Sequence, residues 1–487
     1  MKLLSLTIKN FRSIENETFN IQEVDGTHTF TLIGINESGK SSFLKAVSLV
    51  DNDDEKAVFP KDYFEESEPI SVTLNYQLEP QDEKDLKNTL TEKGFEKDIV
   101  TKIKIEKVAI CTIIDPAANA PKKVFDQIEF QKNIFEDYTL QGDKPAKKDP
   151  QQTQEDFDLE KYFEAQLPKY FWKIAHRIVF WKSDSKHLIN EQINLDTFAA
   201  DPENTSIPLI NCFELAGVSQ DNIASQVTKL KTDPAEINNL QEKLGDKVTA
   251  HIKKVWPNHP IKIKFQINNS FLSFLVEDEK VKYKSKTTDQ RSDGFRQFIS
   301  FLLTISAESA TNQLSNSLLL LDEPETHLHP QAQEYLKDEL IKITRNEENN
   351  VVFFATHSNY MIDKDHIERC LRLSKQSNRK TKLEKIELGK TSYSEANYEV
   401  FGIQSSDYHN ELYGYLEDVE KSKLDSLPKT KKWKNKKTNA TEDVSLATYI
   451  RHSIHHPENT NNAKFTTEEL EESIKTLRGL KYGNNKK

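Results

Sequence analysis

The feature that most constrains this chain is a glycine-rich octapeptide, residues 34–41, which has the sequence GINESGKS. Its spacing, G-x-x-x-x-G-K-S, allows the backbone to turn tightly, so that successive N–H groups point inward and hold phosphate oxygens. The apolar run 29–33 before it is expected to be a buried strand, and the apolar residues between 43 and 47 fall at helical spacing. A loop between a strand and a helix is the context that distinguishes a phosphate-binding loop from a chance match.

Length and composition exclude several classes of protein. The 487 residues suffice for about two to four domains, and no apolar run reaches the roughly 18 residues that a membrane span needs. The N-terminus alternates like a strand and lacks the pattern of a signal peptide. Cys111, Cys212 and Cys370 lie too far apart to indicate a disulfide framework or a zinc site, so we expect a cytoplasmic protein. The net charge of −11 argues against a uniformly basic nucleic-acid-binding surface but leaves room for a local basic patch.

A second candidate site follows the apolar strand predicted at 317–321. Asp322 and Glu323 come directly after a run of four leucines, and ligands of open α/β sheets bind at the carboxyl ends of strands. We expect Asp322 to hold Mg²⁺ together with Ser41, and Glu323 to polarise an attacking water. The alternative is that the acidic pair only forms a turn.

Further residues are candidates for contacts with phosphate. His357 follows another predicted buried strand and is expected at the same sheet edge as Asp322, although it could be a purely structural histidine. Ser292 and Gly294 begin a predicted helix and could form an anion site, or the serine could simply cap the helix. Arg12 is close to the loop in sequence, but it could equally be a surface arginine.

The rest of the chain alternates between predicted strands and helices. Residues 115–157, rich in Pro, Lys, Gln and Asp, are expected to be a loop or mobile insertion, and residues 51–68 are acidic and loop-like. An apolar stripe over 234–256 predicts a packed helix. Helical character is also expected over 80–102 and 158–175, and strands are expected at 3–9, 17–21, 71–76, 104–110, 177–181, 261–265 and 271–276.

Together these segments resemble the ATP-binding-cassette (ABC) class of P-loop ATPases, in the branch shared by chromosome-maintenance (SMC), Rad-fifty-type and RecF ATPases. The resemblance implies an ATPase that uses ATP and Mg²⁺. The residues that match the motifs of this branch are Asn36 and 38–42 in the first motif, Ser292 and Gly294 in the signature, 322–324 in the second nucleotide motif, His329 at the D-loop aspartate position and His357 at the switch histidine.

The resemblance and the spacing together give a set of expected site residues. Glu323 and His357 are the expected catalytic residues, and Ser41 and Asp322 are the expected metal ligands. The residues expected to bind nucleotide are Gly34, Asn36, Glu37, Ser38, Gly39, Lys40, Ser41, Ser42, Arg12, Ser292 and Gly294.

Within this branch, the chain is similar to the compact ATPases of bacterial anti-phage systems, which include the overcoming-lysogenisation-defect (OLD) proteins and the ATPase subunits of the Septu, retron-Septu and PARIS systems. The similar segments are 322–330, 355–363, 398–403 and 408–414. Two departures stand out. The signature has Arg291 and Asp293 where transporter-type members carry Leu and Gly, and the glutamate and D-x-D of the OLD Toprim nuclease have no match after residue 358.

This resemblance implies a sensor or scaffold ATPase that controls a separate effector, expected to be a nuclease. In this branch two heads form a dimer, or a higher homo-oligomer, in which each head holds ATP on its own loop. Ser292 and Gly294 of the partner head then clamp the γ-phosphate, and slow hydrolysis releases the heads. The alternatives are a self-contained effector whose tail cuts RNA and a RecF-like DNA-repair ATPase.

The C-terminal region carries two weaker motifs. A basic run between Lys429 and Lys437 could contact nucleic-acid phosphates, with Trp433 stacking on a base, or it could be a solvated mobile loop. Arg451 and His456 fit R-x4-H, the spacing of HEPN ribonucleases, and a docking helix is the alternative.

The predicted fold is therefore α/β. An ABC-type P-loop ATPase head, with a mixed sheet flanked by helices, is expected to carry an inserted mainly helical region and a helical C-terminal tail. The expected divisions are 1–85 for the N-terminal lobe of the head, 86–265 for the insertion, 266–380 for the C-terminal lobe and 381–487 for the C-terminal helical region.

Overall fold

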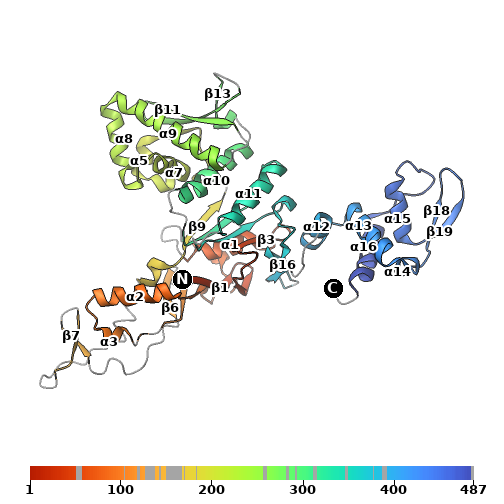
Figure 1. Ribbon diagram of the computed structural model, residues 1–487, viewed down its shortest axis with the longest axis horizontal. Coiled ribbons are helices and arrows are strands. Elements are labelled where there is room, and N and C mark those ends of the chain that lie inside the picture. The colour runs from red at the N-terminus through yellow and green to blue at the C-terminus, as the bar shows by residue number, and fades with distance from the viewer. Residues whose placement is uncertain are drawn as a thin grey trace. The chain divides into compact units, whose positions relative to one another are not determined.

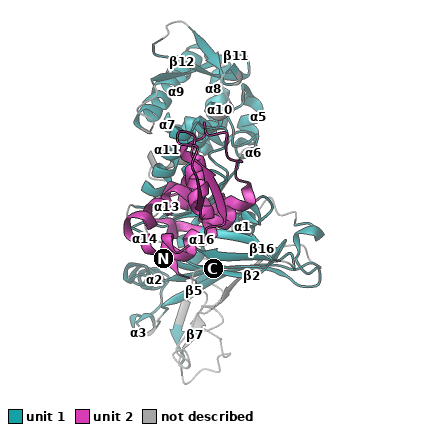
Figure 2. Cartoon of the chain, turned by 90° about the vertical axis from the view of Figure 1, so that its right-hand side faces the viewer, with its two compact units in different colours: residues 1–32, 36–361, 371–385 teal, residues 33–35, 362–370, 386–487 magenta. Residues whose placement is uncertain are grey.

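The chain folds into two compact units, shown in different colours in Figure 2. The first unit comprises residues 1–32, 36–361 and 371–385, and the second comprises residues 33–35, 362–370 and 386–487. No helix in the described part of the chain combines the length and apolarity of a membrane span. The structure, a computed structural model, describes residues 1–50, 58–101, 103, 105–117, 121–126, 138–141, 144–149, 167–168, 170–182, 184–255, 260–280, 284–290, 293–310, 315–345, 349–376, 378–386 and 392–483.

An antiparallel sheet is built from the first strands of the chain. Its order is β2-β1-β4-β5-β6, and the predicted N-terminal hairpin is confirmed by the pairing of β1 with β2. Alternating apolar residues of β1 and β4 face inward, which is the expected pattern for strands covered on one side. The strands are β1 (Lys2–Phe11), β2 (Ile14–Asn20), β4 (Ile70–Gln77), β5 (Lys107–Ile114) and β6 (Pro121–Asp126).

A second sheet brings together strands that are far apart in the sequence. Its order is β17-β16-β3-β15-β14-β9; β15 runs parallel to β3 and β14, β14 runs parallel to β9, and β16 and β17 are antiparallel. The predicted fold class, an ABC-type α/β head with a mixed sheet flanked by helices, is therefore confirmed. The strands are β3 (Thr29–Ile33), β9 (Arg177–Lys182), β14 (Ser317–Asp322), β15 (Val351–Ala355), β16 (Cys370–Lys375) and β17 (Thr381–Lys385).

The central strands β14 and β15 separate two hydrophobic cores. Because side chains alternate between the faces of a strand, Leu318 and Leu320 pack with α1 and the antiparallel sheet, whereas Leu319 and Leu321 pack with α10 and α11. All four leucines are fully buried. This two-sided burial explains why the sequence of both strands is continuously apolar. The helices are α1 (Lys40–Ser48), α10 (Asp293–Ala310) and α11 (Pro330–Lys342).

A lobe of helices and strands is inserted between β9 and α10 (Figure 1). The predicted stripe over 234–256 is confirmed as α9, whose residues Leu244, Val248 and Ile252 are fully buried. The lobe also contains a sheet of order β10-β12-β11, to which β13 adds. Its elements are β10 (Gln192–Asn194), α5 (Leu195–Ala200), α6 (Pro202–Thr205), α7 (Ile207–Leu215), η2 (Gln220–Asn222), α8 (Ile223–Thr232), α9 (Pro234–Val255), β11 (Ile261–Asn268), β12 (Phe271–Asp278), β13 (Ser285–Thr287) and η3 (Thr288–Gln290).

The prediction of a loop over 115–157 is wrong for the residues that the structure describes. The backbone of β6 pairs with the edge of β5, and β7 pairs with β8, so tertiary pairing overrides a composition that disfavours strands. The predicted helix over 80–102 is present as α2 and α3, whereas most of 158–175 and residues 51–57 lie outside the described residues. The elements are η1 (Pro60–Asp62), α2 (Pro80–Glu92), α3 (Lys97–Val100), β7 (Tyr138–Gln141) and β8 (Lys144–Lys147).

The second unit packs helices around a small core of its own. Leu416, Ile450, Ile474 and Leu477 are fully buried there. Helix α16 begins at a capping box, in which the Thr466 side chain accepts a hydrogen bond from the backbone N–H of the third helical residue. Besides β16 and β17, the elements after β15 are η4 (Asn359–Met361), η5 (Ile367–Arg369), α12 (Tyr393–Phe401), α13 (Ser406–Val419), α14 (Lys421–Asp425), β18 (Lys431–Lys434), β19 (Thr441–Val444), α15 (Leu446–His455) and α16 (Thr467–Tyr482).

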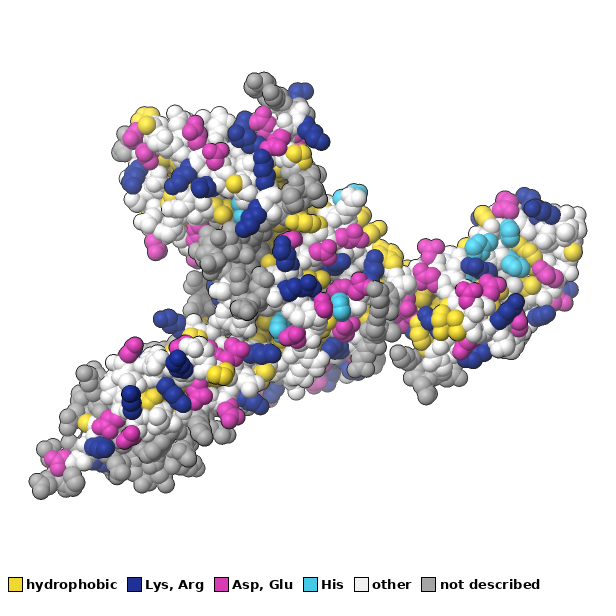
Figure 3. All heavy atoms as spheres, viewed as in Figure 1, with side chains coloured by type: hydrophobic (Ala, Val, Ile, Leu, Met, Phe, Trp, Pro, Cys, Tyr) yellow, Lys and Arg dark blue, Asp and Glu magenta, His cyan; other side chains and the backbone are white. Residues whose placement is uncertain are grey.

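The basic run after Lys429 forms a hairpin strand, β18, and one part of its prediction is wrong. Trp433 is only 3% exposed because it packs with Val444 and Tyr449, so it does not stack on a base in this conformation. Strand alternation turns Trp433 inward and leaves Lys432 and Lys434 exposed. Basic and acidic side chains are interspersed over the face of the molecule in Figure 3.

The aromatic cluster on β15 should dominate the stability of the first core. The Phe353 ring centroid lies 5.1 Å from that of Phe30, 5.5 Å from that of Phe43 and 5.6 Å from that of Phe19. We expect Phe353→Ala to lower the free energy of unfolding by about 3–5 kcal/mol, since it removes a buried ring and leaves a cavity. Denaturant unfolding would measure this loss. The control is Phe271→Ala, at a ring 45% exposed, which should cost no more than about 1 kcal/mol; equal losses would contradict the prediction.

Candidate functional site

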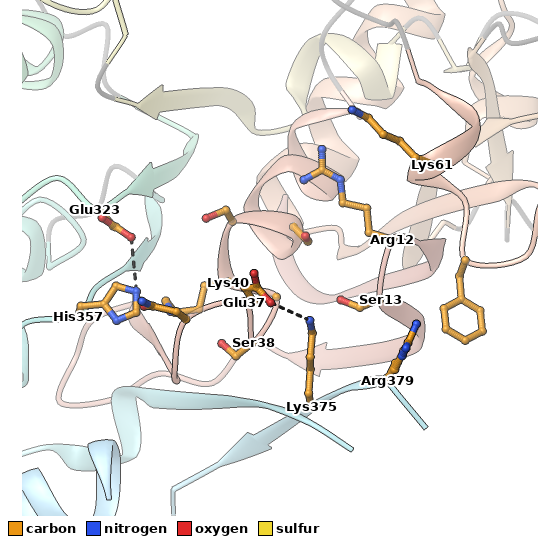
Figure 4. A pocket seen from close by; sticks show the side chains of 15 residues that line it. Arg12, Ser13, Glu37, Ser38, Lys40, Lys61, Glu323, His357, Lys375 and Arg379 are labelled. Atoms are coloured by element: carbon orange, nitrogen blue, oxygen red, sulfur yellow. Dashed lines mark ion pairs between the residues drawn. The ribbon is translucent and has the colours of Figure 1, made fainter. Parts of the chain in front are cut away.

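A pocket of the first unit opens over the N-terminal end of α1 (Figure 4). Its volume is about 1150 Å³, and residues from six separate parts of the chain line it. Gly34, which directly follows β3, is not among the lining residues, and Gly294 is the second residue of α10. The predicted site residues that line the pocket are Arg12, Asn36, Glu37, Ser38, Gly39, Lys40, Ser41, Ser42, Glu323 and His357.

The phosphate loop is held in place by strand β17. The Thr381 hydroxyl donates to the Ser38 carbonyl at 3.0 Å, and the Thr381 N–H donates to the Ser13 carbonyl at 2.7 Å. Gly39 has φ of 107°, and a Cβ added there would lie 2.7 Å from the Thr381 Oγ1. Both the backbone conformation and the close neighbour therefore require glycine at position 39.

The start of α1 is a suitable anion site. The helix begins at Lys40, and its N-cap residue, Gly39, has no side chain that could cap the first backbone N–H groups of the helix. The Ser38 hydroxyl is buried without a hydrogen-bond partner. A buried polar atom of this kind is costly unless a ligand or water satisfies it. These observations fit a bound phosphate group.

Lys40 is a buried cation at the centre of the site. It is only 5% exposed, and burial lowers its pKa, an effect opposed by the charges of Glu323, Asp322 and Glu325. A charged ammonium in such a place needs nearby anions. The three carboxylates supply part of the negative charge, and phosphate groups would supply more.

Ser41 and Asp322 meet as the sequence predicts. The Ser41 hydroxyl donates to the Asp322 Oδ1 at 3.0 Å. Burial raises the pKa of Asp322, and the hydrogen bond from Ser41 opposes that rise. Hydroxyl and carboxylate oxygens are suitable Mg²⁺ ligands, and Mg²⁺ usually binds with one or two protein carboxylates, several waters and substrate phosphates. Accordingly, the described residues contain no cluster of three or more acidic, histidine or cysteine side chains that could hold a metal alone.

Glu323 and His357 lie next to each other at the ends of β14 and β15. The His357 Nε2 is 3.5 Å from the Glu323 Oε1, and both side chains remain partly exposed to the pocket. Glu323 has φ of 49°, a conformation that is uncommon outside glycine. Its carbonyl accepts hydrogen bonds from Gln297 Nε2 at 3.3 Å and Thr326 Oγ1 at 2.9 Å. Burial, together with the charge of Lys40, lowers the pKa of His357 and so favours the neutral form of its ring.

Arg12 lines the pocket and also belongs to an ion pair. Its Nε donates to the Asp62 Oδ1 at 2.7 Å, and its backbone N–H donates to the Asp62 carbonyl at 2.7 Å. The guanidinium is thus fixed at the rim by a buried carboxylate. A contact between Arg12 and nucleotide phosphate stays a prediction.

Several lining residues have no signal in the sequence. Lys375 is the last residue of β16, and Arg379 lies in the turn between β16 and β17. Lys61 belongs to η1, and Phe64 lies three residues after Lys61. Lys375 lies 3.9 Å from the Glu37 carboxylate. These residues belong to no motif, and only the pairing of distant strands brings them to the loop, so local sequence patterns could not identify them.

The remaining predicted residues are not brought to this pocket by the described structure. Ser292 lies outside the described residues, and His329 is the N-cap of α11. In the second unit, the Arg451 guanidinium lies 5.5 Å from the Tyr413 ring centroid, and the His456 Nδ1 lies 3.6 Å from a Glu458 carboxylate oxygen. Each side chain of the R-x4-H pair thus has its own neighbour within the unit.

Comparisons with known proteins identify the family of this chain and two relatives. A family model described as an AAA ATPase domain matches residues 1–362. The chain is 34% identical over 114 residues to the Old nuclease of Escherichia phage P2, which covers 23% of this chain and 19% of the nuclease. It is 25% identical over 139 residues to an uncharacterized protein of Methanocaldococcus jannaschii, which covers 28% of this chain and 35% of that protein. The chain therefore matches only about a fifth to a third of the length of these relatives.

Among solved structures, heads of SMC proteins have similar arrangements. An SMC head bound to the C-winged helix domain of ScpA covers 80% of this chain and 98% of its own length, with 12% identity and a TM-score of 0.44. The SMC head domain from Thermotoga maritima covers 80% of this chain and all of its own length, with 11% identity and a TM-score of 0.38.

The mixed sheet, the loop between β3 and α1 and the acidic pair after β14 define a P-loop ATPase. The family model covers most of the chain, including the loop, the acidic pair and His357. The chain belongs to the AAA ATPase domain family, and it is an ATPase.

The close approach of Thr381 to Gly39 predicts that a larger residue at position 39 weakens ATP binding. We expect Gly39→Ala to weaken ATP binding at least ~10-fold, because the added Cβ has no room and distorts the loop that cradles phosphate. Isothermal titration calorimetry would measure the affinity. Gly26→Ala is the matched control, since Gly26 also has a positive φ, of 66°, but no atom within 4 Å of the added Cβ. Equal affinity in the two variants would contradict the role assigned to the contact.

Proposed function

We propose that this ATPase is the sensor or scaffold subunit of a bacterial anti-phage defence system, and that it controls a partner effector, which we expect to be a nuclease. The proposal rests on the hydrolytic residues gathered in one pocket together with the 34% identity to the Old nuclease over 114 residues. The matching segment covers only 19% of that nuclease, so the proposal takes over an ATPase role and not the activity of the whole protein. A sensor ATPase fits a partial match because its cycle of binding and hydrolysis can control many kinds of effector.

In this proposal, the loop and α1 bind the ATP phosphates through backbone N–H groups, and Lys40 neutralises charge on the β- and γ-phosphates. Mg²⁺, held by Ser41 and Asp322, would neutralise further phosphate charge. Glu323 orients and polarises the attacking water, and His357 donates a hydrogen bond to the γ-phosphate from its neutral ring. This chemistry depends on positioning and charge stabilisation instead of a covalent intermediate.

The proposed cycle requires two heads. Ser292 and Gly294, at the start of α10 in sequence, would complete the site of a partner head, as in the ATPase branch that the chain resembles. ATP then joins the heads, and hydrolysis separates them. The lining residues on the exposed side of the loop, such as Glu37 with 87% of its side chain exposed, leave room for such a partner.

Two substitutions separate nucleotide binding from hydrolysis. We expect Lys40→Ala to abolish ATP binding, because it removes the buried cation, and Glu323→Gln to bind ATP but hydrolyse it at least ~100-fold more slowly, because it removes the carboxylate that polarises water. Equilibrium binding of labelled ATP and single-turnover phosphate release would measure the two steps. Hydrolysis by Glu323→Gln at the wild-type rate would show that Glu323 does not have this role.

The defence role has its own test. We expect cells that carry this gene with its natural neighbours to reduce phage plaque counts, and Lys40→Ala or Ser292→Arg to remove the protection, since one abolishes ATP binding and the other blocks the shared site. Tagged Glu323→Gln protein should retain the effector only when ATP is present. Equal plaque counts for the wild type and Lys40→Ala, or effector capture that is independent of ATP, would contradict the proposal.

A further inference from the structure

A buried carboxylate links the two loops that carry Glu323 and His357. Glu325 is 4% exposed and lies two residues after Glu323. Its side chain does not line the nucleotide pocket, and the proposed chemistry assigns it no contact with ATP or metal. Burying a carboxyl group is costly unless hydrogen bonds compensate, so the hydrogen-bond partners of Glu325 indicate its role.

One oxygen of Glu325 accepts two hydrogen bonds from the segment that follows β15. The Thr356 hydroxyl donates to the Glu325 Oε1, and the backbone N–H of His357 donates to the same oxygen at 3.3 Å. The other oxygen, Oε2, is buried without a hydrogen-bond partner. Glu325 therefore contacts the backbone of His357 itself.

A second connection holds the other side of the same segment. The Ser358 hydroxyl donates to the Gln333 Oε1, and the Gln333 Nε2 donates to the Leu328 carbonyl at 2.8 Å. The Ser358 N–H also donates to the Thr356 Oγ1 at 2.9 Å. His357 is thus flanked by two hydrogen-bonded residues, and both are tied to the loop that begins at Glu323.

These bonds fix the distance on which hydrolysis depends. The strand pairing places Asp322 opposite Ala355, and backbone bonds extend it by one step: the Glu323 N–H donates to the Ala355 carbonyl at 3.1 Å, and the Thr356 N–H donates to the Leu32 carbonyl of β3 at 3.1 Å. Glu325 adds a side-chain connection between the two loops just past these backbone bonds. The 3.5 Å separation between the His357 Nε2 and the Glu323 Oε1 is set within this connected segment.

Burial raises the pKa of Glu325 to about 7, with desolvation as the main cause and the bonds from Thr356 and His357 opposing it. A group with this pKa is partly protonated near neutral pH. The acceptor role of Oε1 does not need the negative charge, because a protonated carboxyl or an amide also presents a carbonyl oxygen. A glutamine at this position can therefore preserve the connection.

We propose that Glu325 is a positioning residue for ATP hydrolysis, which holds the backbone of His357 at a fixed place relative to Glu323. The proposal rests on the roles that the proposed function gives to Glu323 and His357. Loss of the Glu325 side chain should affect the hydrolytic step more than nucleotide binding, because the phosphate loop and Lys40 belong to other elements.

The test compares three substitutions in the full chain by steady-state ATPase kinetics. We expect Glu325→Ala to lower kcat by ~10- to 100-fold, since small displacements of catalytic groups have effects of this size, while KM for ATP changes less than ~3-fold. Glu325→Gln should restore most of kcat. Thr356→Val removes the hydrogen bonds that the Thr356 hydroxyl makes with Glu325 and with the Ser358 N–H, without changing side-chain volume greatly, and should give an intermediate kcat. This variant keeps the proposal testable if Glu325→Ala does not fold.

The outcomes separate this proposal from the proposed function. If Glu323→Gln and His357→Gln are inactive but Glu325→Ala and Thr356→Val keep the wild-type kcat, the positioning role is wrong and the hydrolytic roles stand. Parallel losses of kcat and ATP affinity in Glu325→Ala and Glu325→Gln, with a lower unfolding midpoint, would show a structural role only. If Glu323→Gln is fully active, the proposed hydrolytic roles themselves fail.

Discussion

The parallel pairing of β14 with β15 is the constraint on which the rest of the first unit depends. Its register places Asp322 beside Ala355, so the residues after each strand, Glu323 and His357, emerge at the same edge of the sheet. Alternate side chains of both strands face different hydrophobic cores, and a shift of one residue would exchange those faces. The same burial that stabilises the sheet therefore also fixes the relative positions of the two catalytic candidates.

The site concentrates charge where the sheet and the phosphate loop meet. Lys40 lies among Asp322, Glu323 and Glu325. Burial lowers the pKa of Lys40 and raises the pKa values of Asp322 and Glu325, so it favours the neutral form of each group. Perturbed groups of this kind are enriched at functional sites, because chemistry requires charges that water does not screen. The triphosphate of ATP is strongly anionic and Mg²⁺ is cationic. Their binding would therefore change the charge balance, and with it the protonation, of these four side chains together.

The sequence predicts those parts of the structure whose requirements are local. Eight residues suffice to define the phosphate loop, and the four leucines before Asp322 define a strand buried on both faces. Lys375 and Arg379 could not be predicted, because they reach the pocket only through the pairing of strands far apart in the chain. Trp433 shows the opposite error: a tryptophan within a lysine run suggested an exposed ring, but period-two alternation in a hairpin buries it.

The bond between Thr381 and the phosphate loop has a consequence for the order of events during protein synthesis. Ser38 emerges early from the ribosome, whereas the residue that supports its carbonyl is made 343 positions later. A nascent chain that ends before β17 lacks this support, although it already contains the loop, the acidic pair and His357. The nucleotide pocket in its supported form is therefore completed late in translation, so premature binding of ATP by unfinished chains is disfavoured.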